Sequence, residues 1–95
     1  MRWVTVYIDD ARIPSKGSRW CHMVSDRSFG ELHELAARMG LNRRRWHRDH
    51  YDVLEEERDR ALEMGARPID RREMTALLPL LRARGLRLLP HQRDA

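Results

Sequence analysis

The sequence predicts a small α/β domain of the Rossmann-like class, with three helices on both faces of a mainly parallel, four-stranded sheet. Strand patterns alternate with helical patterns of about ten residues or more, and this alternation is typical of crossover connections between parallel strands. The three helical patterns each begin with residues that can cap a helix. Because 95 residues suffice for one core, we expect a single domain over residues 1–89 and a frayed tail over 90–95.

Four segments have the composition of strands. Residues 3–8 are almost continuously apolar and rich in β-branched and aromatic side chains, which predicts a central strand buried on both faces. Residues 20–24 predict a second, short strand. Residues 41–47 predict a third despite their arginines, because Trp46 provides an apolar anchor, and residues 66–69 predict the last.

Helices are expected at residues 28–40, 53–64 and 71–84. Each begins with a capping box, in which a short polar side chain and an acidic side chain three residues later satisfy free backbone N–H groups. Apolar residues at helical spacing follow each box. Pro79 predicts a kink or a fresh start within the third helix. The capping pairs are Ser28 with Glu31, Asp52 with Glu55, and Asp70 with Glu73.

The chain is basic, with 19 Lys and Arg residues against 15 Asp and Glu residues and a net charge of +4. Lys16 is its one lysine, so arginine dominates. Arginine suits phosphate recognition, and the charge favours a nucleic acid or nucleotide as partner. A GC-rich genome is the better explanation of the preference for arginine over lysine, so the net charge is what favours nucleic acid.

Several classes of protein are disfavoured. Cys21 is the single cysteine, so no disulfide forms within the chain, and a reducing, cytoplasmic location is expected. The first residues do not resemble a signal peptide, and no apolar run is long enough to cross a bilayer, so no membrane partner is expected. Paired zinc cysteines, a phosphate-binding glycine loop and a dinucleotide fingerprint are lacking.

Polar residues in two segments form the candidate catalytic site. Asp9 and Asp10 end the first strand, and His50 and Asp52 follow the third. Because parallel strands gather their carboxyl ends at one edge of a sheet, we expect these residues to meet there. Carboxylates and imidazoles can bind Mn²⁺, Mg²⁺ or Zn²⁺ and can transfer protons. The expected metal ligands are Asp9, Asp10, His22 and His50.

Four further residues are expected to bind the ligand, namely His22, Tyr51, Arg58 and Arg12. His22 reaches the site if its strand ends at the same edge. Arg58 interrupts the apolar face of its helix, so we expect it to point inward and to contact an acidic residue of the site. Structural roles are the alternative: a histidine within a strand often belongs to the core, and Arg58 can pair with a neighbouring glutamate.

The other polar motifs also have two interpretations. Aspartate commonly ends a strand, and Asp52 is a suitable helix N-cap. Residues 43–48, Arg-Arg-Arg-Trp-His-Arg, can follow phosphates and stack a base, or can form a charged edge strand that resists aggregation.

Five short motifs occur in a distinctive order: Tyr7-Ile8-Asp9-Asp10, Trp20-Cys21-His22, Glu31-Leu32-His33, His50-Tyr51-Asp52, and Arg58 with Ala61 and Gly65-Ala66. Together they resemble a family of small bacterial and phage domains, the domain-of-unknown-function family numbered four thousand and thirty-one. The resemblance covers about residues 4–73. The family has no established activity, so the resemblance supports the choice of residues and implies no reaction. Cys21 stands where the family leads us to expect serine, which argues against a nucleophilic role for this cysteine.

Two functions are therefore considered. The first is a His/Asp pocket that acts on or binds a phosphate-containing ligand, as a metal-dependent nuclease or phosphoesterase. The alternative is a non-enzymatic module, of phage origin, that binds nucleic acid or a host protein. A clustered pocket of Asp9, Asp10, His22 and His50 favours the first, and a continuous basic face without such a pocket favours the second.

Overall fold

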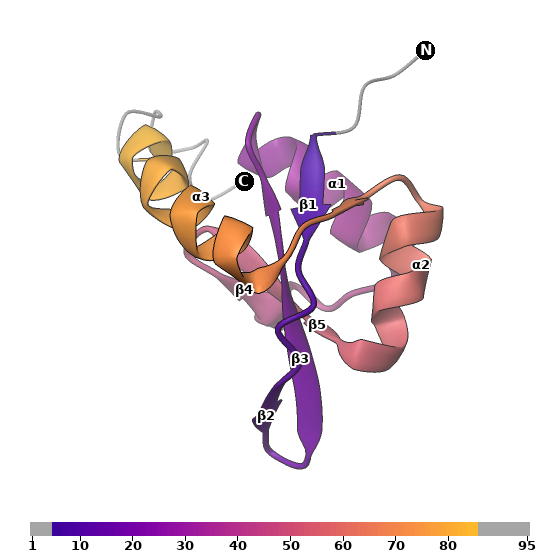
Figure 1. Cartoon of the computed structure of the whole chain (residues 1–95). Coiled ribbons are helices and arrows are strands. Elements are labelled where there is room, and N and C mark those ends of the chain that lie inside the picture. Colours follow the sequence, from indigo (N-terminus) through magenta and orange to yellow (C-terminus); the bar gives the residue numbers. More distant parts are fainter. Residues whose placement is uncertain (1–4, 86–95) are drawn as a thin grey trace.

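The computed structural model describes residues 5–85 of the chain. It forms one mixed sheet of six short strands together with three α-helices (Figure 1). The strand order is β4-β5-β3-β1-β6, and β2 pairs with β3. The strands are β1 (Val6–Ile8), β2 (Ile13–Ser15), β3 (Ser18–Ser25), β4 (Trp46–His47), β5 (His50–Leu54) and β6 (Arg67–Pro68).

The sheet is mostly antiparallel, so the expected Rossmann-like class with a mainly parallel, four-stranded sheet is wrong. The central strand β3 runs antiparallel to β1, β2 and β5, and β4 runs antiparallel to β5. Only the pairing of β1 with β6 is parallel among the described strands. The physical reason is the pair of hairpins that join β2 to β3 and β4 to β5, because a turn of about two residues connects only antiparallel strands. The second hairpin reverses the chain after α1 (Phe29–Met39), so β5 returns antiparallel to β3.

Two tight hairpins reverse the direction of the chain, whereas α1 and α2 (Arg58–Glu63) still connect strands as the expected helices do. In the first, Ser15 pairs with Ser18, and the two residues between them have positive φ, 51° at Lys16 and 78° at Gly17. Two consecutive left-handed residues define a type I′ turn, whose twist matches that of the strands it joins. This β2–β3 hairpin extends beyond the helices in Figure 1. In the second hairpin, β4 and β5 are joined through Arg48, which has φ 59°.

The region around β5 differs most from the sequence-based expectation. The predicted strand at 41–47 contains the 3₁₀ helix η1 (Arg43–Arg45) and only the two strand residues of β4. The predicted helix at 53–64 begins later, because β5 occupies its first residues and η2 (Glu55–Glu57) precedes α2 (Arg58–Glu63). Side chains alternate between half-buried and buried along β5, which is the period of a strand. Asp52 therefore lies within a strand and does not cap a helix.

The first and third helices agree with the sequence pattern. The helix α1 (Phe29–Met39) starts where the Ser28 side chain accepts a hydrogen bond from the Glu31 N–H, and it ends at Gly40 with φ 80°. The helix α3 (Arg71–Gly85) starts with the reciprocal hydrogen bonds of a capping box formed by Asp70 and Glu73. It continues through Pro79 as one helix, so of the two expected outcomes, a kink or a fresh start, the fresh start does not occur.

The helices lie on both sides of the sheet, as expected, with α3 on one side and α1 and α2 on the other (Figure 1). The larger core packs α1 and Ala61 of α2 against alternate residues of β1, β3 and β5. The smaller core packs Met74 and Leu81 of α3 against Val24 and Tyr7. The strand β1 lies inside the sheet, between β3 and β6.

Parts of two expected elements, residues 3–4 and the tail at 90–95, lie outside the described residues. Among residues 5–85, no helix combines the length and apolar character required to span a membrane.

Candidate functional site

Three side chains with metal-binding atoms converge on the face of the sheet that carries α3. His22 of β3 is the cross-strand partner of Asp52 on β5, and His50 lies two residues before Asp52 on the same strand. Because side chains alternate along a strand, all three point to one face. One donor atom from each lies within 4.8 Å of the others. The imidazole rings of His22 and His50 meet edge to face, with 5.2 Å between their centroids.

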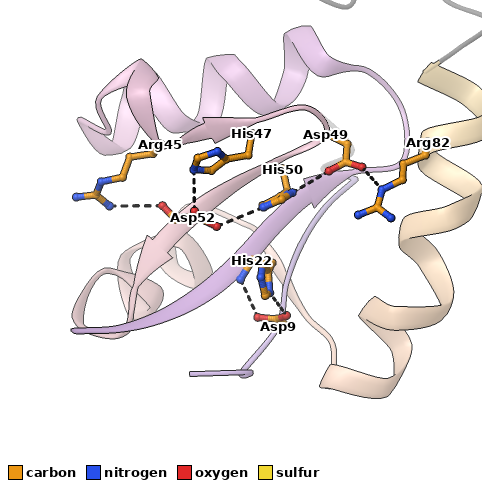
Figure 2. Close-up of polar contacts among 8 residues, drawn as sticks. All are labelled: Asp9, His22, Arg45, His47, Asp49, His50, Asp52 and Arg82. Atoms are coloured by element: carbon orange, nitrogen blue, oxygen red, sulfur yellow. Dashed lines mark hydrogen bonds and ion pairs between the residues drawn. The ribbon is translucent and has the colours of Figure 1, made fainter. Parts of the chain in front are cut away.

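The orientation of His22 is fixed by a buried carboxylate. Asp9 follows β1 and is only 1% exposed. Its Oδ1 accepts hydrogen bonds from the backbone N–H groups of His22 and Ala11, at 2.8 and 3.3 Å. Its Oδ2 lies 2.8 Å from His22 Nδ1, and Figure 2 shows the contacts between Asp9 and His22. A carboxylate can only accept, so the Nδ1 proton of His22 faces Asp9. This arrangement leaves Nε2 of the ring for another partner.

His50 is held in the same way by a second buried carboxylate. Asp49 is 3% exposed, and its Oδ1 lies 2.7 Å from His50 Nδ1. Its other oxygen accepts a 2.8 Å hydrogen bond from Arg82 Nε on α3. The far nitrogen of the ring, Nε2, lies 3.3 Å from Asp52 Oδ1. Figure 2 shows the resulting row of contacts from Arg82 to Asp52.

The carboxylates set the charge of this cluster. Burial disfavours a charged His50, but its hydrogen bonds to Asp49 and Asp52 outweigh burial and raise its pKa to about 9. Burial likewise opposes ionisation of the two aspartates, yet hydrogen bonds from His50 lower the pKa of both, with a further contribution from Arg82 at Asp49. At neutral pH and without a bound cation, His50 is therefore protonated and bridges the carboxylates of Asp49 and Asp52.

Further contacts surround Asp52. Its Oδ2 lies 2.9 Å from Nε2 of His47, the half-exposed last residue of β4. Arg45 Nη1 donates to the Asp52 carbonyl oxygen at 3.5 Å and forms an ion pair with Glu57 at 2.7 Å. Both oxygens of the Asp52 carboxylate thus face imidazoles, and its backbone is tied to η1.

The structure brings four predicted site residues together, Asp9, His22, His50 and Asp52, but not by the expected route. The expectation invoked the carboxyl ends of parallel strands, whereas His22, His50 and Asp52 lie along the face of adjacent antiparallel strands. Within residues 5–85, the converging group with metal-binding spacing consists of His22, His50 and Asp52. Asp9 accepts a hydrogen bond from His22 Nδ1 and is not one of the three converging residues, and Asp10 is exposed.

The other predicted ligand-binding residues lie elsewhere. Tyr51 is buried on the opposite face of the sheet, where its hydroxyl lies 2.6 Å from His33 Nδ1. Arg58 points inward as expected, but its Nε donates to the backbone carbonyl of Asp9, at 2.8 Å, and not to a carboxylate. Arg12 is exposed and forms an ion pair with Glu55. None of these three contacts the converging donors.

Cys21 belongs to the core. Its side chain is fully buried, and burial raises the pKa of the thiol, so the reactive thiolate is disfavoured. This environment agrees with the sequence-based argument against a nucleophilic cysteine.

Two residues of the cluster were not predicted as site residues. Asp49 immediately precedes the polar–apolar alternation of β5, so a strand assignment there would have drawn attention to it. Arg82 carries no comparable signal, because it is one of many exposed arginines and lies 33 residues along the chain from Asp49. Only the docking of α3 on the sheet brings it to the site.

Comparison with known proteins identifies the family without adding a function. The family model described as "Protein of unknown function (DUF4031)" matches residues 6–80. No curated protein and no solved structure matches the chain significantly. The match covers most of the 95 residues and includes every residue of the His/Asp cluster except Arg82. The chain therefore belongs to the DUF4031 family.

Proposed function

We propose that this domain binds a divalent transition-metal ion through His22, His50 and Asp52 and hydrolyses phosphoesters with it. The observation that carries the proposal is the convergence of two imidazoles and one carboxylate within 4.8 Å of one another. Catalytic zinc sites use three protein ligands of this kind and keep a position open for water or substrate. Imidazole favours Zn²⁺ or Mn²⁺ over Mg²⁺, because it is the softer ligand.

The residues behind the two histidines support the proposal. Histidines that ligate a metal almost always donate their other ring N–H to a carboxylate, a carbonyl or water, and that partner fixes the tautomer and the ring plane. Here Asp9 and Asp49 are both buried and both accept from Nδ1 of a histidine. This leaves Nε2 of His22 and of His50 as the natural ligand atoms. A purely structural pair of surface histidines does not require two buried carboxylates.

The proposed reaction requires the three metal ligands and the two carboxylates that orient the histidines. A bound ion activates water near neutral pH and stabilises charge on the phosphoryl oxygens. In the hydrolysis, the oxygen of water bonds to phosphorus, the bond from phosphorus to the leaving alcohol oxygen breaks, and that alcohol takes up a proton. In the absence of metal, a proton on His50 Nε2 occupies the same place, so metal and proton compete for the ring.

Isothermal titration tests the metal site. The parent protein is titrated with ZnCl₂ and with MnCl₂ beside His22→Gln, His50→Gln and Asp52→Asn, and circular dichroism verifies that each is folded. The matched control is Asp59→Asn, which removes an exposed carboxylate on α2. We expect binding at one site in the parent and control, and loss of binding in the three variants. A folded parent that binds neither ion, or variants that bind as the parent does, would contradict the proposal.

Hydrolysis is tested separately with p-nitrophenyl phosphate and bis(p-nitrophenyl) phosphate, a monoester and a diester. We expect product release by the metal-loaded parent, its loss with EDTA, and its return on adding the metal. The Asp52→Asn variant should be inactive and Asp59→Asn active. Metal binding without turnover of either ester would remove the hydrolytic part of the proposal.

A second candidate function is the binding of nucleic acid without hydrolysis. It is favoured by the arginines of η1, which lie beside the cluster at the surface. Binding of an oligonucleotide that is equally tight with and without metal, together with an inactive metal-loaded protein, would support this candidate over the first.

A further inference from the structure

A surface groove adjoins the His/Asp cluster and is not explained by metal binding alone. It has a volume of about 390 Å³ and shares His22 and Asp52 with the cluster. One wall comes from the β2–β3 hairpin and the other from η1 and β4, two parts of the chain far apart in sequence. The lining residues are Ile13, Ser15, Lys16, Trp20, His22, Arg44, Arg45, His47 and Asp52.

The groove carries two cationic side chains, Lys16 and Arg44, that can contact a ligand. Lys16 and Arg44 are exposed, and neither forms an ion pair with any residue between 5 and 85. Arg45 is already paired with Glu57. The carboxylate that lines the groove, Asp52, faces two imidazoles. Two cations that lie on opposite walls and lack an ion pair within the described part of the chain are suited to a phosphate group.

The same groove also has an apolar part. Ile13 is 39% exposed although it is a large hydrophobic residue. Trp20 is half-buried, its indole N–H donates to the Ser15 carbonyl at 3.1 Å, and the Arg45 guanidinium lies 5.2 Å from its ring centre. The indole is therefore held in place at the groove. Aromatic and aliphatic surface next to free cations is the combination that nucleotide-binding surfaces use.

We infer that this groove binds a nucleoside phosphate unit, with the phosphate contacting Lys16 and Arg44 and the base packing against Trp20 and Ile13. The volume lies near the lower end of the roughly 300–1,000 Å³ typical of small-ligand pockets, which suits one nucleotide. This inference rests on the proposed function, because it identifies the phosphoester that is hydrolysed as a nucleotide or nucleic acid. Binding itself does not require the metal, since the cations belong to the chain.

Three ligands distinguish the contribution of the phosphate to binding from that of the base, and a free nucleotide from a nucleic-acid strand. They are ribose 5-phosphate, AMP and a short single-stranded oligothymidylate, each titrated into the full chain at low salt with EDTA present. AMP should bind more tightly than ribose 5-phosphate. If oligothymidylate binds more tightly than AMP, the ligand is a nucleic-acid strand. If it binds more weakly than AMP, the ligand is a free nucleotide. Equal binding of AMP and ribose 5-phosphate would overturn the role of the base, and no binding of any probe would overturn the inference.

Charge-matched double variants test the cations. Lys16→Gln with Arg44→Gln removes the two groove charges, whereas Arg38→Gln with Arg60→Gln removes two exposed charges from helices on the opposite side of the sheet. Both keep most of each side-chain stem and have the same net charge. We expect AMP to bind about tenfold or more weakly to the groove variant, and as in the parent to the control. Equal losses in both would show non-specific attraction and overturn the inference.

A third variant tests the base. Trp20→Leu should bind AMP about tenfold more weakly while its affinity for ribose 5-phosphate is unchanged, because a base stack is lost and the cations remain. Equal loss of both ligands would overturn the contact with the base. Zinc titrations of the three variants keep the two proposals distinguishable. If the groove variants bind zinc but not AMP, the groove binds the nucleotide independently of the metal site. If the parent binds AMP but no metal, the nucleotide proposal holds and the metal proposal fails.

Discussion

The sheet presents an apolar face to α1 and α2, whereas its opposite face carries histidines and aspartates next to α3. The same strands build both faces. Along β5, Tyr51 and Val53 are buried in the larger core, and His50 and Asp52 point the other way. Along β3, Cys21 and Met23 belong to the core, and His22 belongs to the cluster. Strand alternation thus allows a small domain to place a polar site directly over its core.

The two faces also differ in how they are covered. The larger core lies beneath two helices, whereas α3 covers only the part of the opposite face near Tyr7 and Val24. The remaining part holds the His/Asp cluster and the groove. The buried carboxylates there are paired with histidines, so they satisfy their hydrogen bonds without a covering helix, while Nε2 of His22 stays available. This arrangement leaves the site accessible while its supporting carboxylates stay buried.

The largest expected effect is on the apolar face. Met23 is fully buried in the larger core, so Met23→Ala should lower the free energy of unfolding by about 3 kcal/mol through lost burial and a residual cavity. Ile13→Ala, on the open part of the other face, should cost less than about 1 kcal/mol. Urea denaturation measures both. Equal costs would show that side chains on the two faces contribute equally to the free energy of unfolding.

His33 provides a pH-dependent test of the same face. It lies in α1 with its Nε2 buried and without a partner among residues 5–85, and burial, with a smaller contribution from Arg43, lowers its pKa to about 4. An unfolded chain binds this proton near pH 6.5, so the folded protein keeps full stability above that pH and loses stability as the pH falls toward 4.

This effect should amount to about 2 kcal/mol between pH 7.5 and pH 5. Denaturation of the parent and of His33→Gln over this range isolates the contribution, because both proteins share every other titrating group. The parent should show the steeper loss of stability. Parallel pH profiles would mean that His33 is protonated to the same extent in the folded and unfolded states.

Local signals in the sequence predicted those elements whose stabilising contacts are close in the chain. The start of α1 at Ser28, its end at Gly40 and the capping box at Asp70 were all found, because each depends on a few neighbouring residues. The topology was not found, because strand pairing depends on contacts between distant residues. The turn at Lys16 and Gly17 also conceals its hairpin, since lysine is an uncommon residue at positive φ.

The misassignment of β5 shows how two signals compete. Asp52 and Glu55 have the spacing of a capping box, and Leu54, Ala61 and Leu62 continue a helical stripe. The alternation from His50 to Val53 predicts a strand instead, and pairing with β3 decides in favour of the strand. The structure nevertheless brings Asp9, His22, His50 and Asp52 close together, and each is a polar residue beside apolar strand positions. Asp10, expected in the same group, is exposed.

Asp9 and Asp10 offer the next test, because they are adjacent in sequence and differ in environment. In Asp9→Asn, an amide N–H placed against His22 Nδ1 would move the imidazole proton to Nε2, the atom proposed to bind the metal. We expect zinc affinity to fall about 10- to 100-fold, as for other partners of metal-ligating histidines. Asp10→Asn, at an exposed position, should bind zinc as the parent does. Equal effects of the two changes in calorimetry would exclude a supporting role for Asp9.

The smallest expected effect concerns Arg82, the contact between α3 and the cluster. Its side chain is 52% exposed, whereas that of Asp49 is 4% exposed. A half-exposed ion pair is screened by water and salt, so Arg82→Gln should cost less than about 1 kcal/mol of stability. His50 still holds Asp49 in that variant, so zinc affinity should change only about two- to threefold. Asp49→Asn is the matched change at the buried end of this ion pair. It should weaken zinc binding more, because the amide has one acceptor oxygen for the two donors His50 and Arg82 and carries no negative charge. If Arg82→Gln weakened zinc binding as much as Asp49→Asn, the docking of α3 would control the site, and the helix would have to be counted as part of it.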